Sequence, residues 1–230
     1  MSASGPIIAI VQARMSSSRL PGKSLALIQG NPLLAYLFEN LKLSASLDAV
    51  VLATSSAPSD DPLAALASRH GVQAVRGDLM DVSARFLRAI IAHPCQAFVR
   101  ICGDSPLLDP RLVDEAITLY RQGGADLVTN VLRRTYPKGQ SVEVINTQAF
   151  RRAEAAMTDP MDREHVTRYF YTRADEYRIR SFESGGKFGA VNFCVDTAED
   201  LERISALIAR FVPGARRPSW RELVAMEGYE

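Results

Sequence analysis

Short apolar runs alternate with longer amphipathic stretches along the chain, and this alternation is the feature that most limits the possible folds. The apolar runs at residues 7–11, 50–53, 72–75 and 97–102 are each followed by a segment with helical periodicity. Such alternation predicts parallel strands joined by crossover helices. We therefore expect an α/β fold, with a Rossmann-like, mostly parallel sheet flanked by helices.

The helices follow from periodic apolar positions and from capping residues. In the first half of the chain they are expected at residues 32–41, 62–70, 82–92 and 109–123. After residues 126–129 the rhythm becomes irregular, and the pattern predicts strands at 142–145, 178–182 and 190–195 and helices at 150–157, 163–173, 198–211 and 220–226. We expect this second half to supply antiparallel strands.

Length and composition favour a single domain. With 230 residues, 47% of them hydrophobic, the chain can bury one large core. We predict one domain over residues 1–230, with residues 135–189 inserted as a small protruding arm or lobe. That range contains more aromatic surface than a protrusion can bury alone, which predicts a homodimer. The aromatic residues concerned are Tyr169, Phe170, Tyr171 and Phe182.

The charge balance argues against nucleic acid as a partner. The sequence has 27 Lys and Arg against 26 Asp and Glu, so any phosphate binding must be local. No basic segment precedes the first apolar run, and no apolar run has the length of a membrane span, so we expect a cytoplasmic protein without membrane contact. Cys95, Cys102 and Cys194 lack metal or redox spacing and are expected to be small core residues.

A cationic loop follows the first predicted strand. Residues 12–23 read Gln-Ala-Arg-Met-Ser-Ser-Ser-Arg-Leu-Pro-Gly-Lys, which puts Arg14, Arg19 and Lys23 among serines that can donate hydrogen bonds. Gly22 allows close backbone approach and Pro21 stiffens the turn, as a triphosphate site requires. The segment matches neither a Walker A loop nor a dinucleotide-binding loop. The alternative is an ordinary basic surface loop.

Two aspartates stand at the ends of later apolar strands. Asp104 follows the run at residues 97–102, and Asp196 follows the run at 190–195. Mg²⁺ prefers one or two carboxylates together with phosphate oxygens and water, so Asp104 is the best candidate for a metal ligand. The alternatives are a turn or helix-cap role for Asp104 and an N-cap role for Asp196.

Several motifs together resemble a known family. The strongest are residues 12–23 and Gly-Asp-Ser-Pro-Leu-Leu-Asp-Pro at residues 103–110, supported by residues 53–61, 76–78, 164–167 and 195–201. Over nearly its whole length the chain resembles the spore-coat polysaccharide biosynthesis type of cytidylyltransferase, within the acylneuraminate and CMP-sugar synthetase superfamily.

This resemblance implies transfer of CMP from CTP to an acidic or modified sugar, with release of pyrophosphate. It implies that Asp104 and Asp196 meet to hold Mg²⁺, that Arg14, Lys23 and Asp104 act in catalysis, and that the protein is a homodimer. The implied nucleotide-binding residues are Gln12, Ala13, Arg14, Arg19, Gly22, Lys23, Thr54, Ser55, Arg85 and Asp104.

The sugar acceptor is expected in the irregular second half, in or near the lobe at residues 135–189. Its candidate contacts are Asn130, Tyr136, Lys138, Glu143, His165 and Arg168. His165 has a structural alternative, in which it bonds to Glu143 or to a carbonyl group. Arg100 lies between two apolar residues and needs a partner or a ligand.

Two other functions stay open from sequence. One is a glycosyltransferase of similar architecture, although the Asp-x-Asp metal motif of such enzymes is missing because Ser105-Pro106 follows Asp104. The other is a nucleotide-binding subunit without catalysis, which the intact Arg14, Lys23, Asp104 and Asp196 argue against. Residues 139–141 and Ser105 depart from the family pattern, so the acceptor is less certain than the reaction.

Overall fold

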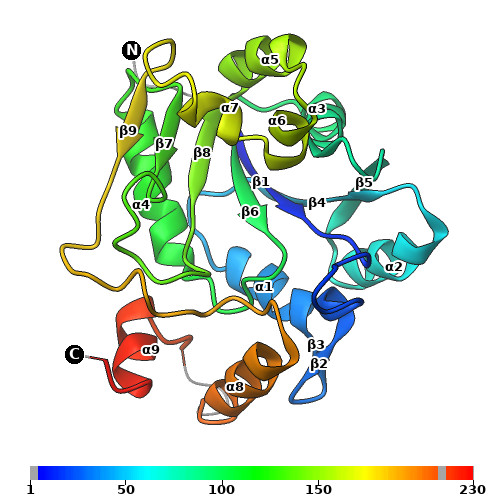
Figure 1. Cartoon of the computed structure of the whole chain (residues 1–230), viewed down its shortest axis with the longest axis vertical. Helices are drawn as coiled ribbons and strands as arrows, with labels where there is room; N and C mark the ends of the chain where they lie inside the picture. The colour runs from blue at the N-terminus through cyan, green and yellow to red at the C-terminus, as the bar shows by residue number, and fades with distance from the viewer. Residues whose placement is uncertain (1–4, 212–215, 230) are drawn as a thin grey trace.

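The computed structural model describes residues 5–211 and 216–229, and these form one seven-stranded sheet with helices on both faces. Its order is β5-β4-β1-β6-β8-β7-β9, seen from right to left in Figure 1. The strands are β1 Ile7–Gln12, β4 Ala49–Ser55, β5 Gln73–Gly77, β6 Ala97–Cys102, β7 Leu127–Thr129, β8 Glu143–Asn146 and β9 Ile179–Ser181. A separate antiparallel pair joins β2 Leu27–Ile28 to β3 Asn31–Pro32.

Strand direction confirms the predicted α/β architecture. β1 pairs in parallel with β4 and β6, and β4 pairs in parallel with β5. β8 is antiparallel to both β6 and β7, as expected for the second half of the chain, whereas β9 is parallel to β7. The sheet is therefore mostly parallel, and the carboxyl ends of β1, β4 and β6 share one edge, where ligands of open α/β sheets bind.

The helices occupy the predicted regions, with one break. They are α1 Leu33–Leu41, α2 Asp61–Arg69, α3 Val82–Ala92, α4 Pro110–Arg121, α5 Thr147–Ala156, α6 Pro160–His165, α7 Arg168–Tyr171, α8 Ala198–Ile208 and α9 Trp220–Met226. Polar caps set several starts. Asp81 caps α3 and Asp109 caps α4, and α8 begins with a capping box formed by Thr197 and Asp200.

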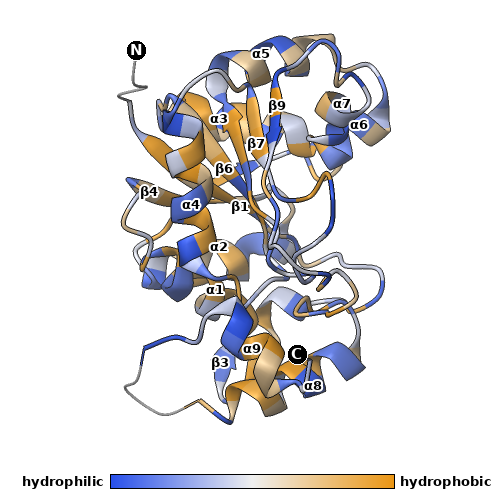
Figure 2. Cartoon of the chain, turned by 90° about the vertical axis from the view of Figure 1, so that its left-hand side faces the viewer, coloured by the Kyte–Doolittle hydropathy of each residue, from blue (hydrophilic) through white to orange (hydrophobic). Residues whose placement is uncertain are grey.

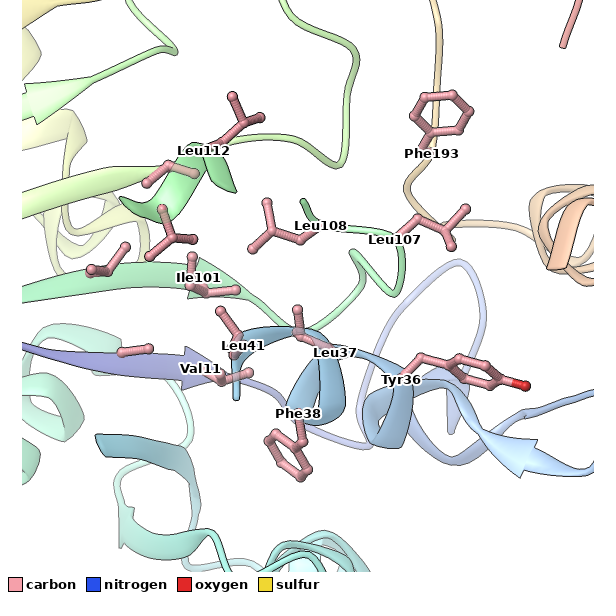
Figure 3. Packing of buried hydrophobic residues seen from close by; sticks show 14 of the residues in the cluster. Val11, Tyr36, Leu37, Phe38, Leu41, Ile101, Leu107, Leu108, Leu112 and Phe193 are labelled. Atoms are coloured by element: carbon pink, nitrogen blue, oxygen red, sulfur yellow. The ribbon is translucent and has the colours of Figure 1, made fainter. Parts of the chain in front are cut away.

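Two hydrophobic clusters cover the sheet. One contains Val11 and Ile101 of the central strands together with Leu37 and Leu41 of α1, which Figure 3 shows side by side. The other lies under α3, α5 and α7 and includes Phe98, packed against other phenylalanines. Figure 2 shows the central strands as mostly hydrophobic and the helices as two-sided, as expected for a sheet buried on both faces.

The single helix predicted over residues 163–173 is wrong, because two short helices, α6 and α7, occupy this region. α6 ends at His165, and Val166 has a φ of 42°, a conformation that a β-branched residue rarely adopts. Val166 is nevertheless fully buried in the cluster under α3, so packing of its side chain offsets the backbone strain. The break gives α6 and α7 separate directions.

The predicted strand over residues 190–195 is also absent. That segment makes only an isolated bridge between Asn192 and Lys138. Its backbone bonds instead to irregular loops: Phe193 N donates to Lys138 O at 2.8 Å, and Val195 N donates to Asp104 O at 2.9 Å. Local β-propensity could not reveal this, because no neighbouring strand runs beside the segment.

Residues 135–189 are built into the domain. They supply β8 and β9 to the sheet and α5, α6 and α7 to one of its faces. Phe170, Tyr169 and Phe182 are buried within the chain itself, so the aromatic argument for a dimer fails. The roles of this range in acceptor binding and dimerisation stay predictions. In the described part of the chain, no helix combines the length and hydropathy that crossing a membrane requires.

Phe98 provides a test of the packing under α3. Its ring is fully buried and lies edge-on to Phe150 and tilted against Phe86. Phe98→Ala should lower the free energy of unfolding by about 3–5 kcal/mol, because it leaves a cavity between β6 and two helices. Chemical denaturation measures the change. Leu43→Ala, at a side chain that is 59% exposed, is the control and should change stability by less than about 0.5 kcal/mol.

Candidate active site

A polar pocket of about 310 Å³ opens at the carboxyl ends of β1 and β6. This is the edge at which the strand order predicts a ligand. Its walls come from the loop after β1, the start of α3, the turn after β6, the end of α6 and the segment that leads into α8. The lining residues are Gln12, Ala13, Arg14, Ser17, Ser18, Arg19, Lys23, Ser24, Val82, Arg85, Cys102, Gly103, Asp104, Glu164, His165 and Asp196.

Lys23 joins the two predicted metal ligands. Its Nζ lies 3.2 Å from Asp104 Oδ2 and 2.8 Å from Asp196 Oδ1, and it also donates to Val195 O at 2.8 Å. Burial alone would lower the pKa of Lys23, but the two carboxylates raise it, so the ammonium stays charged. The tertiary structure thus brings Asp104 and Asp196 to one point, as the resemblance implies. Figure 1 shows the loop after β1 and the segment leading into α8 near the ends of β1 and β6.

The buried carboxylate of Asp60 anchors the loop after β1. Its Oδ1 accepts from Met15 N at 2.9 Å, and its Oδ2 accepts from the side chains of Thr54 and Ser55 and from Ser55 N. Gly22 closes the loop, since its N donates to Met15 O and its φ of 76° suits glycine. The backbone of the loop is therefore fixed from both sides.

This arrangement gives the side chains of Thr54 and Ser55 a supporting role that the sequence did not predict. Both side chains are fully buried and bond to Asp60, and neither lines the pocket. They hold the loop through Asp60, and contact of this segment with a nucleotide stays a prediction. The sequence could not reveal the supporting role, because the Thr-Ser pair at a strand end fits a ligand contact and a buried support equally well.

Arg14 and Arg19 are both in ion pairs. Arg14 Nη2 lies 3.0 Å from Glu164 Oε1, and Arg19 Nη2 lies 3.0 Å from Asp196 Oδ1. Arg19 is 64% exposed, so its pair contributes little to stability. Glu164 was not among the predicted site residues. Its motif at residues 164–167 was the available signal, but only the tertiary structure shows that it faces Arg14.

Arg85 is a nearly buried guanidinium that lines the pocket. Its Nη1 donates to the carbonyl groups of Asp78 and Leu79, both at 2.9 Å, whereas its buried Nε has no partner among the described residues. Burial, and then the nearby Arg14, lower the pKa of Arg85. An arginine with free hydrogen-bonding capacity beside a pocket is suited to an oxygen-rich ligand.

Most of the predicted acceptor contacts are structural residues. Asn130 is buried and bonds to Gln140 O and Val142 N. Tyr136 is buried between the rings of Phe182 and Trp220. The predictions for these two residues are therefore not supported by their positions.

Of the remaining four acceptor candidates, three lie outside the pocket. Glu143 is 3% exposed and pairs with Arg100 at 2.6 Å, and Arg168 pairs with Asp159 and Asp162, away from the pocket. Lys138 is exposed in the loop that bridges to Asn192 and does not line the pocket. His165 alone of the six lines it.

Opposite charges nearly cancel in the pocket. The lining side chains include four cations against three carboxylates: Arg14, Arg19, Lys23 and Arg85, and Asp104, Glu164 and Asp196. A bound triphosphate would therefore exceed the cationic charge that these residues supply. The donor set that would hold a further cation is Asp104 and Asp196, since carboxylate oxygens are the ligands that Mg²⁺ prefers.

Comparison with known proteins identifies the class. The profile of the cytidylyltransferase family matches residues 8–217, nearly the whole chain. The chain belongs to this family of nucleotidyltransferase enzymes, which confirms the resemblance inferred from the motifs.

Two relatives are particularly similar. The spore coat polysaccharide biosynthesis protein SpsF of Bacillus subtilis is 35% identical over 210 residues, which cover 87% of this chain and 85% of that protein. A cytidylyltransferase structure from Leptospira borgpetersenii is 27% identical, with a TM-score of 0.92 over 96% of this chain and 93% of that one.

A more distant structure has the same fold. The structure of CMP:2-keto-3-deoxy-manno-octonic acid synthetase complexed with CTP has a TM-score of 0.69 and 19% identity, and covers 89% of this chain and 99% of that one. The predicted fold class is therefore confirmed by strand order and by likeness to solved structures.

Asp60 gives a test of how the loop is held. In Asp60→Asn, one acceptor oxygen becomes a donor that faces groups which themselves donate. The free energy of unfolding should fall by about 1–3 kcal/mol, and affinity for a nucleotide should fall with it because the loop loses its anchor. Denaturation and nucleotide titration measure the two effects. An unchanged stability would show that the carboxylate does not anchor the loop.

The same interaction has a predictable pH dependence. Burial alone would raise the pKa of Asp60, but hydrogen bonds from Ser55, Met15 and Thr54 lower it below the ordinary 3.8. The stability that it contributes is thus fully present above pH 3.8 and is lost as the pH falls through the lowered value. The stability difference between wild type and Asp60→Asn should stay constant near neutrality and shrink in acid, as denaturation at several pH values would measure.

Proposed function

We propose that this protein transfers CMP from CTP to an acidic or modified sugar and releases pyrophosphate, in surface polysaccharide or glycoconjugate biosynthesis. The observation that carries the proposal is the position of Lys23 between Asp104 and Asp196, on the same pocket as Arg14 and Arg19. Membership of the cytidylyltransferase family and similarity to SpsF support the nucleotide and the pathway class.

The reaction is an in-line attack by a sugar hydroxyl on the α-phosphorus of CTP. The oxygen–phosphorus bond to the sugar forms as the bond to pyrophosphate breaks, and the hydroxyl proton leaves with solvent. The tasks of the protein are then positioning and charge stabilisation. Arg14 and Lys23, with Arg19 in support, neutralise the negative charge that develops on the leaving pyrophosphate.

Each of these cations must exchange its present partner for phosphate oxygens. Lys23 leaves one or both carboxylates, and Arg14 turns from Glu164. The Arg14 side chain is 31% exposed, so its exchange costs little, whereas Lys23 is 12% exposed and can leave its carboxylates only as phosphate oxygens replace them.

Mg²⁺ fits the donor set at the end of β6. Asp104 and Asp196 face one point, and no group of three or more possible metal ligands occurs among the described residues, so phosphate oxygens and water would complete the coordination. When bound, the ion would supply positive charge that stabilises the reacting phosphate. Asp104 and Asp196 would hold it, and Asp196 N, fixed by Asp200 Oδ2 at 3.0 Å, would keep the second carboxylate in place.

The nucleoside is assigned to the side of the pocket formed by α3. Arg85 can donate to oxygens of the base or ribose through groups that its carbonyl partners leave free. Gln12 and Ala13 lie beside it at the end of β1. Gly103 is required here, because a Cβ at this position would lie 2.8 Å from Gln12 O and from Ala13 Cβ.

The acceptor is assigned to the end of the pocket at His165 and Glu164. These side chains can bond to sugar hydroxyl groups as donor and acceptor. A glycosyltransferase reaction has no support from the family match, and Asp104 lacks the neighbouring acidic residue that such enzymes use. A role as a subunit without catalysis would not explain why Lys23, Asp104 and Asp196 meet at the pocket.

Pyrophosphate release tests the proposal. The purified protein is mixed with CTP, Mg²⁺ and a panel of acidic and modified sugars, and released pyrophosphate is measured against ATP, GTP and UTP. We expect release with CTP and at least one sugar, and none without Mg²⁺. Absence of release with every sugar and nucleotide would contradict an enzymatic function.

Asp104→Asn tests the metal ligand. The amide keeps the shape of the side chain but loses the charge, so pyrophosphate release should fall at least about a hundredfold, equivalent to about 3 kcal/mol of transition-state stabilisation. Asp114→Asn is the control, because Asp114 bonds to Ser44 outside the pocket. If Asp104→Asn is as active as the control, Asp104 is not a ligand of the metal.

A further inference from the structure

A buried polar network lies beneath the pocket, on the face of the sheet covered by α3 and α7. Its centre is Arg100 on β6, whose side chain is 13% exposed. Arg100 Nη1 donates to Glu143 Oε2 at 2.6 Å and to Thr167 Oγ1 at 3.3 Å, and Arg100 Nε donates to Gln12 Oε1 at 3.1 Å. The guanidinium therefore joins three segments that are far apart in the sequence.

Glu143 fixes the guanidinium in place. Its second oxygen, Oε1, accepts from Tyr171 OH at 2.5 Å, and Tyr171 is in contact with Thr129 Oγ1 at 2.8 Å. Burial, and then Glu143, raise the pKa of Tyr171, so the phenol keeps its proton and donates it to Glu143. Both carboxylate oxygens are thus satisfied, and Arg100 has little freedom to turn.

The chemistry of arginine determines how Gln12 is oriented. A guanidinium has only N–H donors, so the amide oxygen of Gln12 must face Arg100. The amide nitrogen, with its two N–H groups, then lies on the other side of the same planar group. Gln12 lines the pocket, and its side chain is only partly buried. An amide can donate or accept hydrogen bonds, depending on its orientation. The network fixes the orientation of the Gln12 amide, so its N–H groups are the ones left to donate to a ligand in the pocket.

We propose that Arg100 is a positioning residue, which holds Gln12 so that its side-chain amide donates to an oxygen of bound CTP. The inference rests on the proposed function, because it takes CTP as the ligand. Arg100 itself does not line the pocket, and it acts through Gln12.

The nucleotide is the ligand that this donor fits. Gln12 directly precedes Ala13 and Arg14 of the cationic loop, and Gly103 N donates to its carbonyl oxygen at 2.9 Å beside Asp104. The nucleoside assigned to this side of the pocket offers acceptor atoms there, namely O2 and N3 of cytosine and the ribose oxygens, to which an amide can donate. A glutamine with the opposite orientation would present an acceptor and repel these atoms.

Gln12→Glu tests the polarity directly. The carboxylate has nearly the same shape and can still accept from Arg100, so the fold and the melting temperature should be retained. Its other oxygen, however, would face the nucleotide as an anion. We expect the Kd for CTP with Mg²⁺, measured by calorimetry without a sugar, to rise at least about tenfold. An unchanged Kd would overturn the proposal.

A double-mutant cycle tests whether Arg100 acts through Gln12. Arg100→Met is combined with Glu143→Leu, so that no buried charge is left unpaired. This pair should raise the Kd for CTP several-fold in the wild-type background and have no further effect when Gln12→Leu is already present. Equal effects in both backgrounds would overturn the proposal, because Arg100 would then act independently of Gln12.

Two further outcomes separate the inference from the proposed function. Arg178→Met is the control, since it removes an ion pair with Asp126 at the far edge of the sheet and should leave the Kd for CTP unchanged. If Gln12→Glu raises only the KM for a sugar, Gln12 serves the acceptor and the inference is wrong. If the wild-type protein does not bind CTP at all, the proposed function itself fails.

Discussion

The ammonium group of Lys23 is the point on which the organisation of the site depends. It joins the cationic loop after β1 to Asp104 at the end of β6 and to Asp196 before α8, at distances of 3.2 and 2.8 Å. Two carboxylates this close would repel each other without a cation between them. In the present structure the chain itself supplies that cation, and the same carboxylates provide the oxygen ligands that Mg²⁺ prefers. The loop and the proposed metal ligands are therefore parts of one charge-balanced unit.

Buried polar groups beneath the pocket keep that unit in place. Asp60 holds the loop through Met15 N, and Arg100 holds the side chain of Gln12 from below. Asp60 is bonded to Thr54 and Ser55 of β4, and Arg100 of β6 to Glu143 of β8, so each couples the pocket to the sheet. The polar groups that contact a ligand are thus few, and a larger number serves to orient them.

The likeness to cytidylyltransferases extends over residues 8–217 of the sequence and over the fold. Most of the residues predicted to bind the acceptor lie outside the pocket. Asn130, Tyr136 and Glu143 have structural partners, whereas Glu164 and His165, the last two residues of α6 before the strained Val166, line the pocket. The end of the pocket proposed for the acceptor therefore lies next to a local break in the helical region.

The sequence by itself determined the order of strands and helices in the first half, the cationic loop and the importance of Asp104. Each depends on local information, namely apolar periodicity, capping residues and charge at a strand end. The tertiary structure decided which polar residues face the pocket. Thr54 and Ser55 proved to be supports for Asp60, residues 190–195 proved to be irregular, and Glu164 joined the site. The physical reason is that a polar side chain finds its partner across the fold, and the sequence does not record which distant groups will satisfy it.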